Sequence, residues 1–255
     1  MKIGAQLFTL RAFTKTLPEL EETLCRVADM GYNSVQVSGT CSYTPEELLP
    51  MLKKAGLSCD LTHYNADRMI GEPQAVAEEH HRFECSAVGF GSMPGLWAKD
   101  ADPKVFAPRF VNTIKEIAPV YQKENIQLMY HNHAHEYFMK VGDMTVMEYL
   151  SSEIKKEEMG FTLDVYWVER GGFDPVAEIK RLKGRLSHVH LKDIDKETMQ
   201  FAPVGQGTQN YPAILSALED AGTRFAFVEQ DDCYGKDPFL CLKESFDYLH
   251  SLGVC

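Results

Sequence analysis

A short stretch rich in imidazoles lies near the middle of the chain. His131, His133 and His135 occur together with Glu136, directly after the mainly apolar run Ile126–Met129. Histidine is the commonest metal ligand among protein side chains, and its pKa lies close to neutral pH, so it also exchanges protons easily. The stretch therefore predicts a metal-binding or proton-transfer site rather than a solvated loop.

Three further polar clusters each end an apolar, strand-like segment later in the chain. Asp164 belongs to the first cluster, His190 and Lys192 to the second, and Glu229 to the third. Carboxylate and imidazole groups together suit Mn²⁺, Mg²⁺, Co²⁺, Fe²⁺ or Zn²⁺. Packed together without a cation, the carboxylates would repel one another and raise one another's pKa.

These clusters predict one divalent-metal site, provided that the fold brings them together. The expected ligands are Glu136, Asp164, His190 and Glu229. His131 and His133 have the alternation to face the same place, and either one could replace Glu136 as the first ligand.

The segments that position these residues alternate between strand-like and helix-like patterns. Short apolar runs predict strands at residues 3–8, 34–37, 57–61, 86–90, 126–131, 160–165, 186–191 and 225–229. Apolar residues at helical spacing predict helices at residues 17–30, 44–55, 73–84, 103–124, 144–152, 175–182, 211–221 and 238–252.

This alternation predicts an α/β protein of the (β/α)8 TIM-barrel class, with a single domain over residues 1–255. A doubly wound open sheet is the alternative, but the chain has no Gly-rich dinucleotide-binding fingerprint. In a barrel, the carboxyl ends of consecutive strands share one rim, so the polar clusters would converge there. Pro108 and Pro119 are candidate breaks in the longest helix, and His80 and His81 are expected at the surface.

Composition narrows the range of partners. The net charge of −11 argues against binding a nucleic-acid backbone or an anionic membrane surface, since both need a basic face. The first residues run directly into a strand-like segment without a signal peptide, and no apolar run is long enough to span a bilayer. The expected location is the cytoplasm.

The order of the motifs resembles the xylose-isomerase-like TIM-barrel superfamily, and within it the sugar phosphate isomerase/epimerase branch. The matching motifs lie at residues 131–137, 163–168, 172–175, 188–193, 203–207 and 228–231. The resemblance implies a divalent metal held by a Glu, an Asp, a His and a Glu from strands five to eight. The last three ligands correspond to Asp164, His190 and Glu229, whereas His131 takes the strand-five end and Glu136 follows on the loop.

These features predict a metal-dependent isomerase or epimerase that acts on a sugar, sugar phosphate or polyol through an enediolate. The candidate groups for proton transfer and oxyanion stabilisation are Glu136, Glu229, His131, His133 and Lys192. The candidate substrate contacts are Gln6, Arg11, His63 and Trp167.

Three alternatives differ in chemistry. A metal-dependent lyase or dehydratase acting on 3-keto glycosides or an inosose would use the same enediolate, and the imidazoles of strand five favour it. A non-catalytic sugar-binding barrel would need no metal. A DNA-repair endonuclease of the same superfamily would need a basic face, which the charge of −11 opposes. The expected partner is a small carbohydrate, and the sequence leaves open whether the chain forms a homo-oligomer.

Overall fold

Eight parallel strands close into a barrel in the computed structural model, which describes residues 1–254. Cys255, the last residue of the expected domain, lies outside the described residues. In order around the barrel, the strands are β1 (Lys2–Gln6), β12 (Phe225–Val228), β9 (His188–Leu191), β8 (Gly160–Asp164), β5 (Gln127–His131), β4 (Ala87–Phe90), β3 (Ser58–His63) and β2 (Ser34–Val37). The predicted TIM barrel is confirmed.

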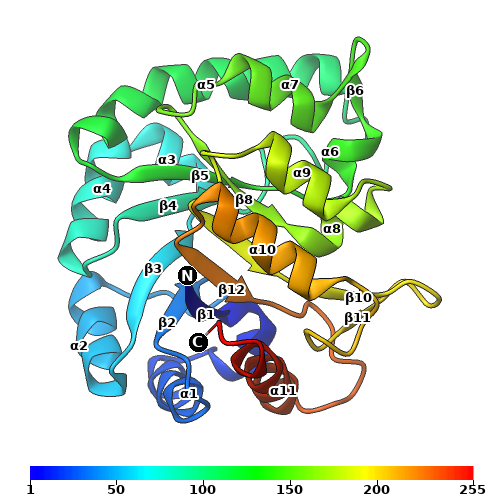
Figure 1. The fold of residues 1–255 in the computed structure, drawn as a ribbon. Coiled ribbons are helices and arrows are strands. Elements are labelled where there is room, and N and C mark those ends of the chain that lie inside the picture. The colour runs from blue at the N-terminus through cyan, green and yellow to red at the C-terminus, as the bar shows by residue number, and fades with distance from the viewer. Residues whose placement is uncertain (255) are drawn as a thin grey trace.

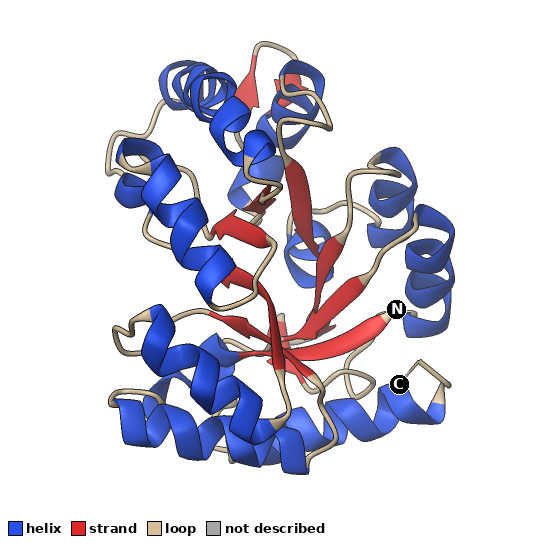
Figure 2. Ribbon diagram, turned by 90° about the vertical axis from the view of Figure 1, so that its left-hand side faces the viewer, coloured by secondary structure: helices blue, strands red, loops and turns tan. Residues whose placement is uncertain are grey.

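Helices cover the outside of this barrel, as the two ribbon views show (Figures 1 and 2). The helices that connect successive strands are α1 (Leu17–Asp29), α2 (Pro45–Ala55), α4 (Pro73–Arg82), α5 (Pro103–Lys123), α7 (Val146–Glu153), α9 (Pro175–Arg181) and α10 (Tyr211–Ala221), and α11 (Pro238–Ser251) follows β12. The main hydrophobic core lies between the strands and this layer of helices.

The helix boundaries follow from local signals in the sequence. Thr16 and Glu19 form a capping box at the start of α1, and Gly56 ends α2 in the left-handed conformation with φ of 71°. Pro108 and Pro119, the candidate breaks, lie inside an unbroken α5. Both prolines lie off the buried face of this helix, and the packing of that face outweighs the missing backbone hydrogen bonds.

The interior of the barrel is layered. Its middle is apolar and is formed by Leu61, Ala87, Met129 and Phe227. A Cβ atom at Gly4 would lie 2.7 Å from the ring of Phe227, so glycine is needed there for the ring to fill the centre. The apolar layer closes the barrel below the carboxyl ends of the strands, which makes the mouth a pocket and not a channel.

Several short elements lie around this mouth, and the sequence patterns did not reveal them. They are the 3-10 segment η1 (Leu7–Phe13), the helices α3 (Ala66–Gly71), α6 (His135–Phe138) and α8 (Val165–Arg170), and two hairpins, β6 (Lys140–Val141) with β7 (Met144–Thr145) and β10 (Asp193–Asp195) with β11 (Gln200–Ala202). Among the described residues, no helix is both long and apolar enough to cross a membrane.

One expectation about the helices is wrong. His80 is fully buried, with Nδ1 2.7 Å from the Val76 carbonyl oxygen and Nε2 2.8 Å from the Thr62 hydroxyl. Those two contacts satisfy the imidazole inside the core, whereas His81 is exposed as expected.

Candidate metal centre and pocket

Four side chains converge at the mouth of the barrel. His131 and Asp164 end β5 and β8, His190 is the last residue but one of β9, and Glu229 directly follows β12. Each of the four offers one ligand atom, and these atoms all lie within 4.8 Å of one another. All four residues are buried. The parallel register explains the meeting, because Asp164 pairs with His190 across β8 and β9.

This group has the chemistry of a cation site. Three of the ligand atoms already have polar contacts within the group: Asp164 Oδ2 and Glu229 Oε2 lie 3.0 Å and 2.7 Å from the Lys192 ammonium, and His190 Nδ1 lies 3.1 Å from Glu229 Oε2. His131 Nδ1 is buried without a hydrogen-bond partner among the described residues, and buried polar atoms are normally satisfied. A divalent ion held by these two carboxylates and two imidazoles would contact all four residues and would give His131 Nδ1 its missing partner.

Neighbouring groups hold these ligands in place. The amide oxygen of Asn132 accepts a hydrogen bond from the Asp164 backbone N–H at 2.9 Å, and Gln6 Nε2 donates to Glu229 Oε1 at 3.1 Å. His190 Nε2 lies 2.7 Å from the amide oxygen of Gln36. In the tautomer in which Nε2 donates to this oxygen, Nδ1 carries the lone pair that a metal would bind.

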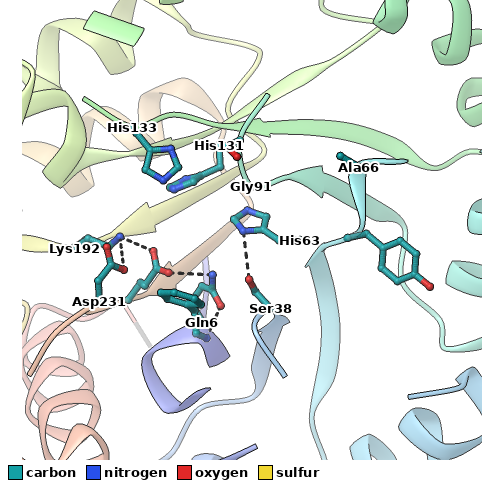
Figure 3. A pocket seen from close by; sticks show the side chains of 13 residues that line it. Gln6, Ser38, His63, Ala66, Gly91, His131, His133, Lys192 and Asp231 are labelled. Carbon is teal, nitrogen blue, oxygen red and sulfur yellow. Dashed lines mark hydrogen bonds and ion pairs between the residues drawn. The ribbon is translucent and has the colours of Figure 1, made fainter. Parts of the chain in front are cut away.

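Lys192 brings a positive charge into the same group. Its buried ammonium lies 3.0 Å from Asp164 Oδ2, 2.7 Å from Glu229 Oε2 and 3.0 Å from Asp231 Oδ1. Figure 3 shows Lys192 beside Asp231. Burial lowers the pKa of Lys192, but the three carboxylates outweigh burial and raise this pKa well above its ordinary value. Three carboxyl groups thus share one ammonium, and a divalent cation would add counter-charge to this group.

The imidazoles of the mouth are held neutral. Burial, followed by the charge of neighbouring groups, lowers the pKa of His63 to about 3, of His133 to about 4, and of His131 well below its usual range. His190 differs: burial lowers its pKa, but the Glu229 and Asp164 carboxylates together outweigh burial and raise it. Neutral imidazoles can bind a metal or accept a proton.

A cavity of about 330 Å³ opens in front of this group. Its size falls in the range of sites for small ligands. Figure 3 shows His131 and His133 on one side of it and Lys192 with Asp231 on another. The cavity is lined by Gln6, Phe8, Ser38, His63, Tyr64, Ala66, Gly91, Ser92, His131, His133, Lys192, Glu229 and Asp231.

Glu136, the expected first ligand, does not lie in the group of four. Its buried carboxylate accepts hydrogen bonds from the Tyr130 hydroxyl and from the backbone N–H of His133, the latter at 3.0 Å. Burial raises the pKa of Glu136 to about 7. The structure instead brings His131, the alternative from strand five, into the group.

The expected substrate contacts divide into two sets. Gln6 and His63 line the cavity. Trp167 lies beside it, with its ring centroid 5.4 Å from that of His133 and 5.4 Å from Lys192 Nζ. Arg11 does not line the cavity, because its guanidinium donates hydrogen bonds to the carbonyl oxygens of Phe8 and Asp231, each at 2.8 Å.

Sequence reasoning missed several residues of the mouth. Asp231 lies two positions after Glu229, so the alternation of a strand would have indicated that it faces the same side. Burial raises the pKa of Asp231 to about 6, although Lys192 opposes this shift. The supports Gln36 and Asn132 gave no comparable signal, because single amide side chains at strand ends are common.

Comparisons with known proteins agree with this architecture. A family model described as xylose isomerase-like TIM barrel matches residues 24–251. No curated protein matches the chain. Among solved structures, a sugar phosphate isomerase/epimerase from Parabacteroides distasonis is 21% identical, with a TM-score of 0.82 and coverage of 98% of this chain and 93% of that one.

Two epimerases of known substrate also share the fold. A D-psicose 3-epimerase from Clostridium cellulolyticum H10, determined with D-tagatose, is 14% identical with a TM-score of 0.75, and all of both chains is covered. An L-ribulose 3-epimerase is 15% identical with a TM-score of 0.77, and the match covers 100% of this chain and 95% of that one. At these identities the likeness concerns the fold.

Proposed function

The chain belongs to the xylose isomerase-like TIM-barrel family, and on that premise we propose that it is a divalent-metal-dependent isomerase or epimerase of sugars. The observation that carries the proposal is the buried convergence of His131, Asp164, His190 and Glu229 at the closed mouth of the barrel. The sugar isomerases and epimerases among the structural neighbours support the substrate class.

In this proposal the group of four residues holds the cation, and the metal, when bound, polarises a carbonyl and steadies negative charge on neighbouring oxygens. The chain's own groups do the rest. Gln6 and His63 line the cavity at positions where they can orient hydroxyl groups. The apolar layer beneath the mouth closes the site from below, so water enters only from the rim.

Proton transfer needs a basic atom on the cavity wall. His133 is neutral and lines the cavity, and its ring does not belong to the group of four. Glu229 and Asp231 offer carboxylate oxygens on the side of Lys192. The ammonium of Lys192 then stabilises charge that develops on an enediolate oxygen of the substrate. Isomerisation returns the proton to the neighbouring carbon, whereas epimerisation returns it to the same carbon from the opposite face.

A lyase or dehydratase remains the second candidate. His131 stands in the group of four, where the family resemblance implies a glutamate. This exchange removes one of the two glutamates that an epimerase would use for proton transfer on opposite faces of a sugar. Release of water or of a leaving group from a 3-keto glycoside or an inosose would favour this second reading.

Metal analysis and solvent exchange test the proposal together. The purified protein is expected to retain a divalent ion, and Asp164→Asn and His131→Ala are expected to lose it while staying folded. Glu136→Gln is the matched control, because Glu136 is buried nearby but lies outside the group of four. Incubation of ketoses in D₂O should place deuterium next to the carbonyl with the wild-type protein and the control, and not with Asp164→Asn or His131→Ala. Full retention of metal and exchange by Asp164→Asn would refute the assignment.

A further inference from the structure

We propose that this site takes a sugar without a phosphate group, because the chain's own carboxylates already occupy the positions where the rim would hold one. This inference deepens the proposed function and rests on it. It follows from three independent parts of the rim: a backbone cradle, the helix N-termini and the cationic side chains.

The backbone cradle lies after β9, the seventh strand of the barrel. Asp193 is buried there, and its Oδ1 accepts hydrogen bonds from the N–H groups of Ile194 at 2.8 Å and Gln209 at 3.3 Å. Its Oδ2 accepts from Gly205 at 2.9 Å and Gly207 at 3.1 Å. Converging backbone N–H groups form an anion site, and the loops after strands seven and eight commonly bind phosphate in such barrels.

The loop is built to close on this carboxylate. A Cβ atom at Gly207 would lie 2.3 Å from Asp193 Oδ1 and 2.6 Å from the carbonyl oxygen of Ile194. Glycine is therefore required for the backbone to come this close. The glycine-containing motif at residues 203–207 thus serves an internal anion, and its N–H groups are not free for a ligand.

The helix N-termini in the same half of the rim are capped by side chains of the chain itself. Asp164 accepts a hydrogen bond from the Trp167 N–H at the start of α8, at 3.2 Å. Asn210 caps α10 through the Ala213 N–H at 3.2 Å, and Asp237 caps α11 through the Phe239 N–H at 2.9 Å. A helix N-terminus attracts phosphate through its unpaired N–H groups, and these side chains compete for them.

The cationic side chains near the cavity also have partners within the chain. Lys192 is the one lysine or arginine among the described residues that line the cavity, and its ammonium pairs with three carboxylates. One of these, Asp231, is labelled beside it in Figure 3. The guanidinium of Arg11 donates hydrogen bonds to two carbonyl oxygens. A phosphate monoester carries nearly two negative charges, so it would meet Glu229 and Asp231 without a free partner. Neutral hydroxyl groups, in contrast, find Gln6, Ser38 and Ser92 on the cavity wall.

Calorimetry with matched pairs of ligands tests the inference. The Mn²⁺-loaded protein is titrated with D-fructose and D-fructose 6-phosphate, and with D-psicose and its 6-phosphate. In each pair, the phosphate ester is expected to bind about tenfold or more weakly than the free sugar, because like charges are brought together. Equal or tighter binding of an ester would overturn the inference.

Inorganic phosphate separates this inference from the proposed function. It is titrated into the metal-free protein, so that a metal cannot hold it, and no saturable binding is expected. Saturable binding would overturn the inference. If no sugar of either kind binds the loaded protein, the proposed function fails, and the phosphate titration still decides whether the rim excludes anions.

Two charge-matched variants locate the effect. Asp231→Asn removes one of the carboxylates that pair with Lys192. It should lower the ratio of the affinity for the free sugar to the affinity for its phosphate ester severalfold. Asp232→Asn removes the same charge from the next residue, which makes no ion pair with Lys192, and should leave the preference unchanged. If both variants shift the preference equally, overall charge and not the committed Lys192 governs selection, and this part of the argument is wrong.

Discussion

At the scale of single residues, Lys192 and Glu136 show how burial and charge decide a role. The ammonium of Lys192 pairs with three carboxylates, and the carboxyl group of Glu136 accepts hydrogen bonds from two neutral donors. The sequence alone could not separate their roles, because both lie within a few positions of a strand end. Whether His131 or Glu136 faces the mouth depends on the turn at residues 132–135, which brings the Glu136 carboxylate back to the His133 N–H.

Glu136 should give the folded protein a measurable pH dependence. Its pKa is raised to about 7 by burial, whereas the unfolded chain has the ordinary value near 4.3. The folded state therefore binds the proton more tightly. The contribution of this group to stability is complete below about pH 4.3 and is lost as pH rises through about 7, by roughly 4 kcal/mol in total.

Glu136→Gln removes this titration and keeps a side chain that can both accept from the His133 N–H and donate to Tyr130. Chemical denaturation between pH 5 and pH 8 is expected to show a smaller loss of unfolding free energy in the variant than in the wild type, by an amount on the order of 2–3 kcal/mol. Parallel curves for both proteins would show that Glu136 is ionised throughout.

Replacing Lys192 should make folding depend on metal. In Lys192→Met, the buried carboxylates lose their counter-charge, and the metal-free protein is expected to lose about 3–5 kcal/mol of stability. Added Mn²⁺ should restore part of this loss. Lys196→Met is the control, because Lys196 is exposed and pairs only with Glu169, so a change under about 1 kcal/mol is expected. Thermal unfolding with and without EDTA measures the stability of both variants. If both lose the same stability and respond equally to metal, Lys192 does not act as the counter-charge of the buried carboxylates.

At the scale of elements, the sequence predicted the eight strands and their connecting helices because each buries a regular apolar face. It missed α3, α6 and α8, which have four to six residues each and are too short to show a period. It also missed the hairpin of β10 and β11, where Asp193 at the start of β10 accepts hydrogen bonds from the segment after β11, as far along the chain as Gln209. Such contacts exist only after the fold has formed.

The unbroken α5 leads to a prediction of its own. Pro119 is exposed in the last part of this helix and removes one backbone hydrogen bond. Pro119→Ala should restore that bond and stabilise the protein by about 1–3 kcal/mol, less the gain in flexibility of the unfolded chain. Thermal denaturation measures the effect, and a lower melting temperature would show that the proline ring itself packs favourably.

At the scale of the whole molecule, the proposed metal should contribute to global stability. A ligand that binds only the folded state stabilises it by about 2.7 kcal/mol at a hundredfold excess over its Kd. EDTA is expected to lower the melting temperature of the wild type, and Mn²⁺ to restore it. Asp164→Asn should not respond to either addition. A response of this variant equal to that of the wild type would place the stabilising ion elsewhere.

The arrangement of the two chain ends has a practical consequence. Met1 and Val254 line the same hollow beside β1, and both ribbon views show the two ends close together (Figures 1 and 2). A short flexible linker could join them, and new ends could be opened in the exposed turn at Gly142 between β6 and β7. Such a circular permutant would carry every residue of the mouth in its native place, and its metal content would show whether the barrel assembles irrespective of where synthesis starts.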